Sequence, residues 1–103
     1  METLSQKYVD QVVSCLMRSL PKDWRSFVFT CEYGDYTVLQ YGTVKTEKSV
    51  ENIHITQECN CDKDIMDIAM SIYLSKYEET GIKLAKMVMS AKKGEDISVE
   101  LSY

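Results

Sequence analysis

The sequence has few residues that break secondary structure and few that carry typical catalytic chemistry. Its 103 residues include one proline, four glycines, one histidine and one tryptophan. So little proline and glycine excludes collagen-like and low-complexity chains. No apolar run approaches the roughly 20 residues that a membrane span needs. Residues 1–6 lack the basic start and apolar core of a signal peptide, so we expect a soluble cytoplasmic protein.

The length indicates a single domain over residues 1–103. A mass of 11.9 kDa leaves no room for a second domain. Hydrophobic residues make up 45% and charged residues 27%, which is typical of a globular protein. A domain of this size buries roughly 60–65% of its unfolded surface. That supports one modest core and little internal space for a deep active site.

The acidic side chains are concentrated in the middle of the chain. The formal net charge is −4. Residues 31–70 hold three basic and eight acidic side chains, a net −5, whereas the segments before and after carry +1 and 0. This balance argues against direct nucleic-acid binding, which needs a basic surface. The acidic segment is either a solvated face or a surface that meets a basic partner.

The first half of the chain predicts a helix followed by a strand meander. Apolar side chains at three- and four-residue spacings predict a helix over residues 3–20, which Pro21 ends. Phe27, Phe29, Cys31 and Tyr33 alternate with Val28, Thr30 and Glu32, which predicts a strand over 24–33, and Gly34-Asp35 indicates a hairpin turn. Two further strands are expected over 36–44, with a bulge at Gly42, and over 50–57. Residues 45–49 are expected to form a loop.

The second half predicts a helix and a hairpin. A helix begins near Asn60 or Asp62 and ends at Gly81. Residues 82–91 fit either a helix or a strand, but the clean alternation over 97–103 requires a partner strand, which favours a strand over 84–91. The predicted fold class is α+β, ordered α-β-β-β-α-β-β, with an antiparallel sheet and the helices packed on one face.

Residues that typically support catalysis or metal binding are scarce. His54, the one histidine, lies in an expected strand without a catalytic signature around it. Cys15 and Cys31 fall on apolar stripes and are interpreted as core residues, and no disulfides are expected in the cytoplasm. Cys59 and Cys61 form a C-x-C pair, whereas zinc sites more often use wider spacing. We therefore expect no catalytic residues, no metal and no cofactor, with a small metal-dependent or cysteine-based enzyme as the remaining catalytic alternative.

Three aspartates, Asp62, Asp64 and Asp67, resemble a calcium-binding run only in part. An EF-hand loop needs glycine at its sixth position and a bidentate acid at its twelfth. Counted from Asp62, these positions hold Asp67 and Tyr73. Acidic residues at the start of a helix are the better interpretation, because they favour the positive end of the helix dipole.

One short motif resembles a known family. The opening helix followed by Pro21-Lys22-Asp23-Trp24 and an aromatic strand is similar to the YezG-like immunity proteins of bacterial toxin systems. That family has a helix, a P-x-D-W turn, a strand meander, a second helix and a final hairpin, an ending that Gly94 and Tyr103 fit. The resemblance implies a protein that binds and neutralises a cognate toxin, often a nuclease, for example in contact-dependent growth inhibition.

The predicted function is therefore that of an immunity protein, not an enzyme. It would bind one toxin domain, one-to-one, through an acidic and aromatic surface, with no direct contact to nucleic acid or membrane. An acidic patch can occupy the basic, phosphate-binding site of a nuclease and accelerate association. The alternative is a small acidic secretion-type chaperone that holds an effector segment. The candidate toxin-binding residues are Glu32, Asp35, Tyr36, Glu47, Glu51, Asp62, Asp64 and Asp67.

Overall fold

The computed structural model describes residues 6–34, 37–53 and 65–103, with side chains in the last range from residue 67 onward. The elements are α1 (Gln6–Ser19), β1 (Trp24–Tyr33), β2 (Val38–Thr46), β3 (Val50–Asn52), α2 (Ile65–Thr80), β4 (Lys86–Lys92) and β5 (Ser98–Ser102). This confirms the predicted α+β order. The structure also settles the ambiguous region, because the chain forms a strand there rather than a helix.

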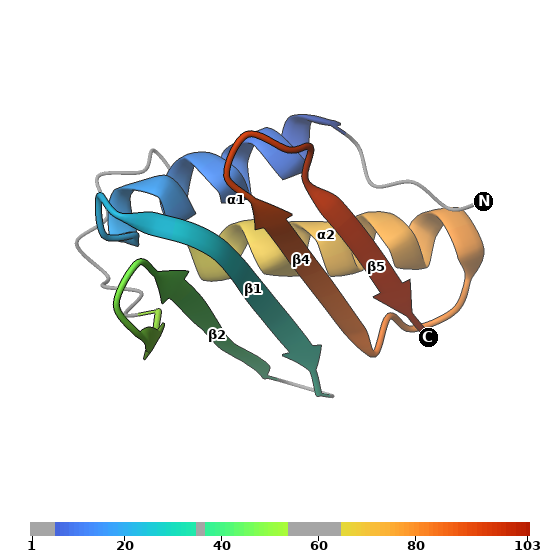
Figure 1. The fold of residues 1–103 in the computed structure, drawn as a ribbon. Coiled ribbons are helices and arrows are strands. Elements are labelled where there is room, and N and C mark those ends of the chain that lie inside the picture. Colours follow the sequence, from blue (N-terminus) through green and yellow to red (C-terminus); the bar gives the residue numbers. More distant parts are fainter. Residues whose placement is uncertain (1–5, 35–36, 54–64) are drawn as a thin grey trace.

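The five strands form one antiparallel sheet in the order β3-β2-β1-β4-β5. The long strand β1 lies at the centre and pairs with β2 on one side and β4 on the other. Through this pairing the C-terminal hairpin joins the N-terminal meander in a single sheet. Both helices lie on the same side of the sheet, as predicted, and no described element covers the opposite side (Figure 1). We call this uncovered side the open face.

The core lies between the sheet and the two helices. Strand β1 contributes Phe27, Phe29 and Cys31, which alternate with outward-facing residues along the strand. Strand β4 adds Met87 and Met89, both with no exposed surface. The helices complete the core with residues spaced at helical period, which are Val9, Val12, Cys15 and Leu16 of α1 and Ile68, Ala69 and Ile72 of α2.

Both helix ends lie where the sequence predicts them. Helix α1 ends before Pro21, and the Leu20 N–H donates a last hydrogen bond to the Leu16 carbonyl over 3.1 Å. Helix α2 ends before Gly81, whose φ of 73° is a left-handed conformation that favours glycine. The Gly81 N–H donates to the Tyr77 carbonyl over 2.8 Å, which satisfies one of the carbonyls at the helix end.

The predicted bulge at Gly42 is wrong. The ladder between β1 and β2 runs without a shift from Ser26–Lys45 to Tyr33–Val38, and its irregularity lies between Trp24 and Ser26. Gly42 serves another purpose: a Cβ atom there would lie 2.5 Å from the Val28 carbonyl oxygen and 2.9 Å from Ile53 Cδ1. Close packing, rather than an extra residue, explains this glycine.

The remaining boundaries differ in small ways. Strand β2 continues to Thr46, so the first two residues of the expected loop over 45–49 belong to the strand. Thr46 then organises the turn, since its hydroxyl accepts hydrogen bonds from the backbone N–H groups of Lys48 and Ser49. The expected strand over 54–57, the helix start near residues 60–62 and the helical residues 3–5 lie outside the described residues.

Candidate protein-binding surface

The open face is defined by the alternation of side chains along the strands. On β1, Phe27 and Phe29 point toward the helices, whereas Val28 between them is 44% exposed. Residues that are Cα partners in an antiparallel ladder project to the same side of the sheet. The register therefore places on the open face Ser26, Val28, Thr30 and Glu32 of β1, Leu39, Tyr41, Thr43 and Lys45 of β2, Val50 and Asn52 of β3, Lys86, Val88, Ser90 and Lys92 of β4, and Ser98, Glu100 and Ser102 of β5.

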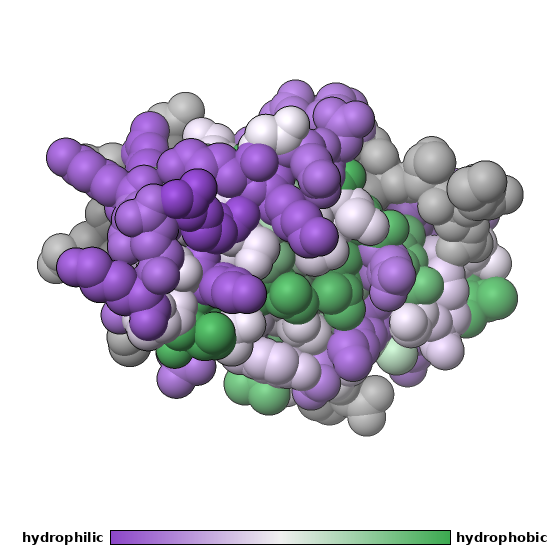
Figure 2. All heavy atoms as spheres, viewed as in Figure 1, coloured by the Kyte–Doolittle hydropathy of each residue, from purple (hydrophilic) through white to green (hydrophobic). Residues whose placement is uncertain are grey.

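Apolar side chains occupy the middle and one end of the open face. Figure 2 shows a hydrophobic patch at the centre of this face, over β1 and β4. The strand register places the exposed Val28 of β1 and the half-buried Val88 of β4 on this face. Toward the end of β1, Tyr41 and Leu39 of β2 are 45% and 59% exposed. Adjacent apolar side chains left in water are a common feature of surfaces that bind another protein.

The charges on the open face do not follow the charge of the whole chain. Its strand residues include three lysines and two glutamates, although the chain carries −4. Glu32 is engaged within the face, because its carboxylate accepts a 2.7 Å hydrogen bond from the Tyr41 hydroxyl. That bond to the Glu32 carboxylate raises the pKa of Tyr41. The acidic segment of the sequence therefore does not produce an acidic sheet face.

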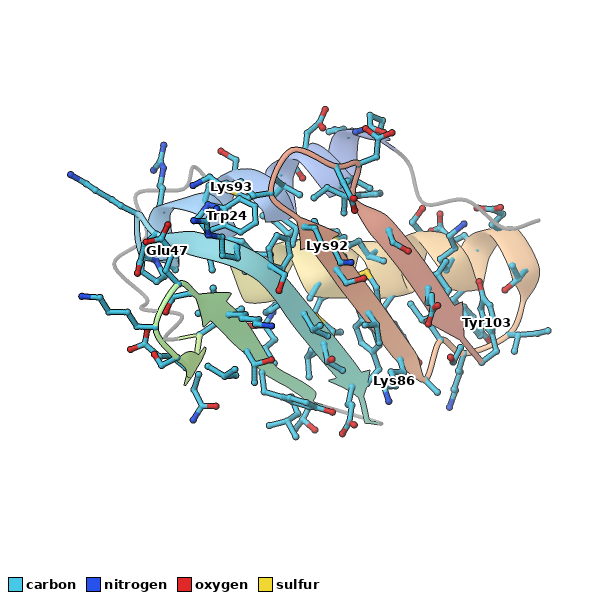
Figure 3. The ribbon with its side chains drawn as sticks, viewed as in Figure 1. Trp24, Glu47, Lys86, Lys92, Lys93 and Tyr103 are labelled. Atoms are coloured by element: carbon cyan, nitrogen blue, oxygen red, sulfur yellow. The ribbon has the colours of Figure 1, made fainter. Side chains whose placement is uncertain are left out.

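Lys93 and Trp24 meet at the end of the sheet where β1 begins. Lys93 Nζ lies 5.4 Å from the centroid of the Trp24 ring and donates to the Lys22 carbonyl over 3.3 Å. Trp24 in turn meets Phe27 edge-on, with ring centroids 5.8 Å apart. Figure 3 shows Trp24 and Lys93 together at this end, with Glu47 nearby and Lys86 at the opposite end of β4. Hydrophilic side chains are also dense at this end in Figure 2.

The structure distributes the predicted acidic residues over several parts of the molecule. Glu32 lies on the open face near the end of β1. Glu47 follows β2 and pairs with Arg25, both side chains being more than half exposed. Glu51 lies in the edge strand β3 as the Cα partner of the inward-facing Val44. Asp67 is exposed on α2, in the helical layer.

These four acids do not form one patch. Glu47 directly follows Thr46, which is the Cα partner of Trp24 at the start of β1. Glu32 lies eight residues further along β1, which is about 26 Å from Trp24 at the rise of a strand. Arg25 also offsets the charge of Glu47. The other four predicted residues, Asp35, Tyr36, Asp62 and Asp64, lie outside the described residues. An acidic surface that includes them stays a prediction.

A small open pocket lies beside the edge of the sheet. It measures about 280 Å³ and is lined by Ser19, Leu20, Pro21, Val44, Glu51 and Asn52. Glu51 is the one charged group among the described lining residues, and it is exposed. The described lining combines one carboxylate with an amide and a hydroxyl.

The described cysteines are buried, as predicted, but the expectation that no disulfide forms is wrong. Cys15 is disulfide-bonded. Cys31 is a free thiol with no exposed surface, and burial raises its pKa to about 12. Within the described ranges no three His, Cys, Asp or Glu side chains gather to hold a metal ion. His54, Cys59 and Cys61 lie outside those ranges.

The lysines and valines of the open face were missed by reasoning from charge clusters in the sequence. Lys45 lies in the segment interpreted as acidic, and Lys92 is not among the candidate toxin-binding residues chosen from the sequence. The sequence signal that could have identified Val28 was strand alternation, which places its side chain on the opposite face of the sheet from Phe27 and Phe29. Alternation alone does not reveal that β1 lies between β2 and β4, which is what brings the two lysines onto one surface.

None of the described helices is both long and apolar enough to cross a membrane. Comparison with models of protein families gives no match for the chain, and a search of curated proteins finds no significant relative. The resemblance to the YezG-like immunity proteins therefore stays a prediction based on the sequence motif.

Proposed function

We propose that this chain is an immunity protein that binds a cognate bacterial toxin domain one-to-one through the open face of its sheet. The observation that carries the proposal is the open face itself, with Val28, Leu39 and Tyr41 between 44% and 59% exposed. Burying such side chains against a partner contributes about 25 cal/mol per Å² of apolar area before the costs of association. In this proposal the chain performs no reaction and acts by covering the toxin.

The order of elements also supports the proposal. The P-x-D-W resemblance implies a helix, a meander, a second helix and a final hairpin, and the structure has these elements in this order. The resembling motif itself lies at the start of β1, where Trp24 packs on Phe27 and holds the turn that follows Pro21 against the core. The motif therefore has a structural role in presenting β1, the central strand of the proposed surface.

The test pairs the chain with the toxin domain encoded by the adjacent reading frame. Co-expression is expected to restore growth, and calorimetry with an inactivated toxin is expected to give a one-to-one complex. A Val28→Ser/Leu39→Ser variant should bind at least tenfold more weakly, since it removes two exposed apolar contacts. Leu74→Ser is the matched control, because Leu74 is 56% exposed but lies on α2 in the helical layer.

Three results would contradict the proposal. The first is a wild-type chain that neither binds the toxin nor protects the cell. The second is a Val28→Ser/Leu39→Ser variant that protects as well as the wild type. The third is a Leu74→Ser control that loses as much affinity for the toxin as the Val28→Ser/Leu39→Ser variant. A stable dimer that grips an unstructured effector segment would instead indicate the secretion-type chaperone.

The proposal places the protein in the cytoplasm of the toxin-producing cell. The Cys15 disulfide is unusual for that compartment, where thiols are kept reduced. Alkylation of thiols in intact cells, followed by mass spectrometry of the Cys15 peptide, measures its redox state directly. A reduced Cys15 in a protective strain agrees with a cytoplasmic site of action, whereas an oxidised one points to an oxidising compartment.

A further inference from the structure

Two lysines form a row across the three central strands of the sheet. Ser26 of β1 is the Cα partner of Lys45 on β2 and also of Lys92 on β4. All three side chains therefore project from the open face, and two strand spacings place the lysine Cα atoms about 10 Å apart. Both lysines are exposed, and neither has an ion-pair partner among the residues that the structure describes.

Charged groups of both signs neighbour the two lysines at this end. Lys93 is held over Trp24, so its ammonium group stays at the beginning of β1. The nearby Glu47 is already paired with Arg25. The exposed Glu95 and Asp96 follow in the turn between β4 and β5, where the Glu95 N–H donates to the Lys92 carbonyl. The two open-face lysines thus remain available for a negatively charged partner.

The lysine row adjoins the apolar centre of the open face. Val28 follows Ser26 by two residues, about 6.6 Å along the strand. Its Cα partners are Thr43 and Ser90, and Val88 is the partner of the next outward residue, Thr30. A ligand lying across the sheet at this point meets lysine ammonium groups on one side and aliphatic side chains on the other.

We propose that this end of the open face binds an acidic segment of a protein partner. The carboxylates of that segment lie against Lys45 and Lys92, and its apolar side chains pack on Val28 and Val88. The inference rests on the proposed function in taking the toxin domain as that partner. Because the phosphate-binding cleft of a nuclease is basic, an acidic segment of the toxin lies outside that cleft. The immunity protein therefore covers the toxin at a surface other than the cleft.

A protein partner fits this surface better than a nucleic acid. Base stacking needs an open aromatic face, but Lys93 lies over the Trp24 ring and Trp24 meets Phe27 edge-on. A nucleic-acid backbone also needs a continuous basic track. Here Glu32 and Glu100 occupy the same sheet face beyond the lysine row. In a protein segment, acidic side chains can pair with the two lysines while apolar side chains pack on the two valines.

The first experiment measures binding of the inactivated toxin domain by calorimetry at two salt concentrations. Lys45→Glu/Lys92→Glu should lower affinity at least tenfold and reduce the salt dependence of binding. Lys7→Glu/Lys83→Glu is the matched control, since both lysines are exposed and lie outside the sheet. The control should bind like the wild type, and equal urea midpoints for all three proteins establish that they are folded.

A second experiment separates failure of the inference from failure of the proposed function. The backbone amides of the full chain are followed by NMR during titration with a capped peptide of four Glu-Leu repeats. Shifts centred on Ser26, Val28 and Lys92 that vanish in the lysine variant support the acidic-segment site, whether or not the toxin binds. Amide shifts centred elsewhere, or none, overturn it.

Three further outcomes overturn the inference. Normal binding of the toxin by Lys45→Glu/Lys92→Glu leaves the immunity function intact but shows that the toxin does not bind through the two lysines. Tighter binding of a 15-nucleotide oligothymidine than of the peptide assigns the lysine row to nucleic acid. A wild-type dimer that the lysine variant converts to monomer, measured by light scattering, assigns the face to a second copy of the chain.

Discussion

The ammonium group of Lys93 lies 5.4 Å from the centroid of the Trp24 ring. The two residues come from opposite ends of the chain, and the β1–β4 pairing brings them together, with the Lys93 N–H donating to the Arg25 carbonyl over 2.7 Å. Cation–π contacts at exposed sites stabilise by about 0.5–1 kcal/mol. This contact therefore links the turn after α1 to the C-terminal hairpin.

We expect Trp24 and Lys93 to be energetically coupled. In a double-mutant cycle with Trp24→Leu and Lys93→Gln, urea unfolding should give a coupling free energy of about 0.5–1 kcal/mol. Glutamine keeps an N–H group that can donate to the Lys22 carbonyl, so the cycle isolates the charge. Additive effects of the two substitutions would show that the contact contributes nothing to stability.

Gly42 is expected to be the most sensitive glycine of the sheet. Gly42→Ala should lower the free energy of unfolding by about 1–3 kcal/mol, because the new methyl group overlaps the Val28 carbonyl and the Ile53 side chain. The measurement is urea unfolding followed by fluorescence of Trp24, the one tryptophan. Thr43→Ala, at the next and exposed position, is the control and should change stability by less than about 0.5 kcal/mol. Equal losses at both positions would refute the packing explanation.

The fold was predictable because its local signals agree with one another. Phe27 and Phe29 alternate with the outward-facing Ser26, Val28 and Thr30. Pro21 stops α1, and Gly81 ends α2 in a left-handed conformation. Each of these signals acts within a few residues, and the final arrangement satisfies all of them. Gly42 shows the limit of such signals, since its requirement comes from Ile53 and Val28, which reach it only through tertiary packing.

The candidate surface was much less predictable than the fold. Net charge along the sequence grouped Glu32 with Glu47, but the two residues lie near opposite ends of β1. Conversely, Lys45 and Lys92 are far apart in the sequence and become neighbours because both pair with Ser26. Strand order is a long-range property that charge counting does not contain, so surface composition had to come from the structure.

The Arg25–Glu47 ion pair is expected to contribute little to stability. Its side chains are 59% and 53% exposed, and such pairs typically contribute less than about 1 kcal/mol. Glu47→Gln should therefore leave the urea midpoint almost unchanged. It should also leave Arg25 free to add positive charge at the beginning of β1, which strengthens binding of the acidic probe peptide. Weaker peptide binding by Glu47→Gln would contradict this electrostatic account.

Cys31 is expected to be almost unreactive while the protein is folded. Burial raises its pKa from about 9 to about 12, so at pH 9 the folded thiol has several hundred-fold less of the reactive thiolate than an exposed cysteine. Because the folded state holds this proton more tightly, its contribution to stability is complete below about pH 9 and is lost as the pH rises toward 12.

Iodoacetamide labelling at pH 9, assigned to the Cys31 peptide by mass spectrometry, should be slow in the wild type. A cysteine introduced by Val50→Cys, at a position 67% exposed, should label quickly in the same protein. Equal labelling rates at the two sites would show that Cys31 is accessible and that its burial is wrong.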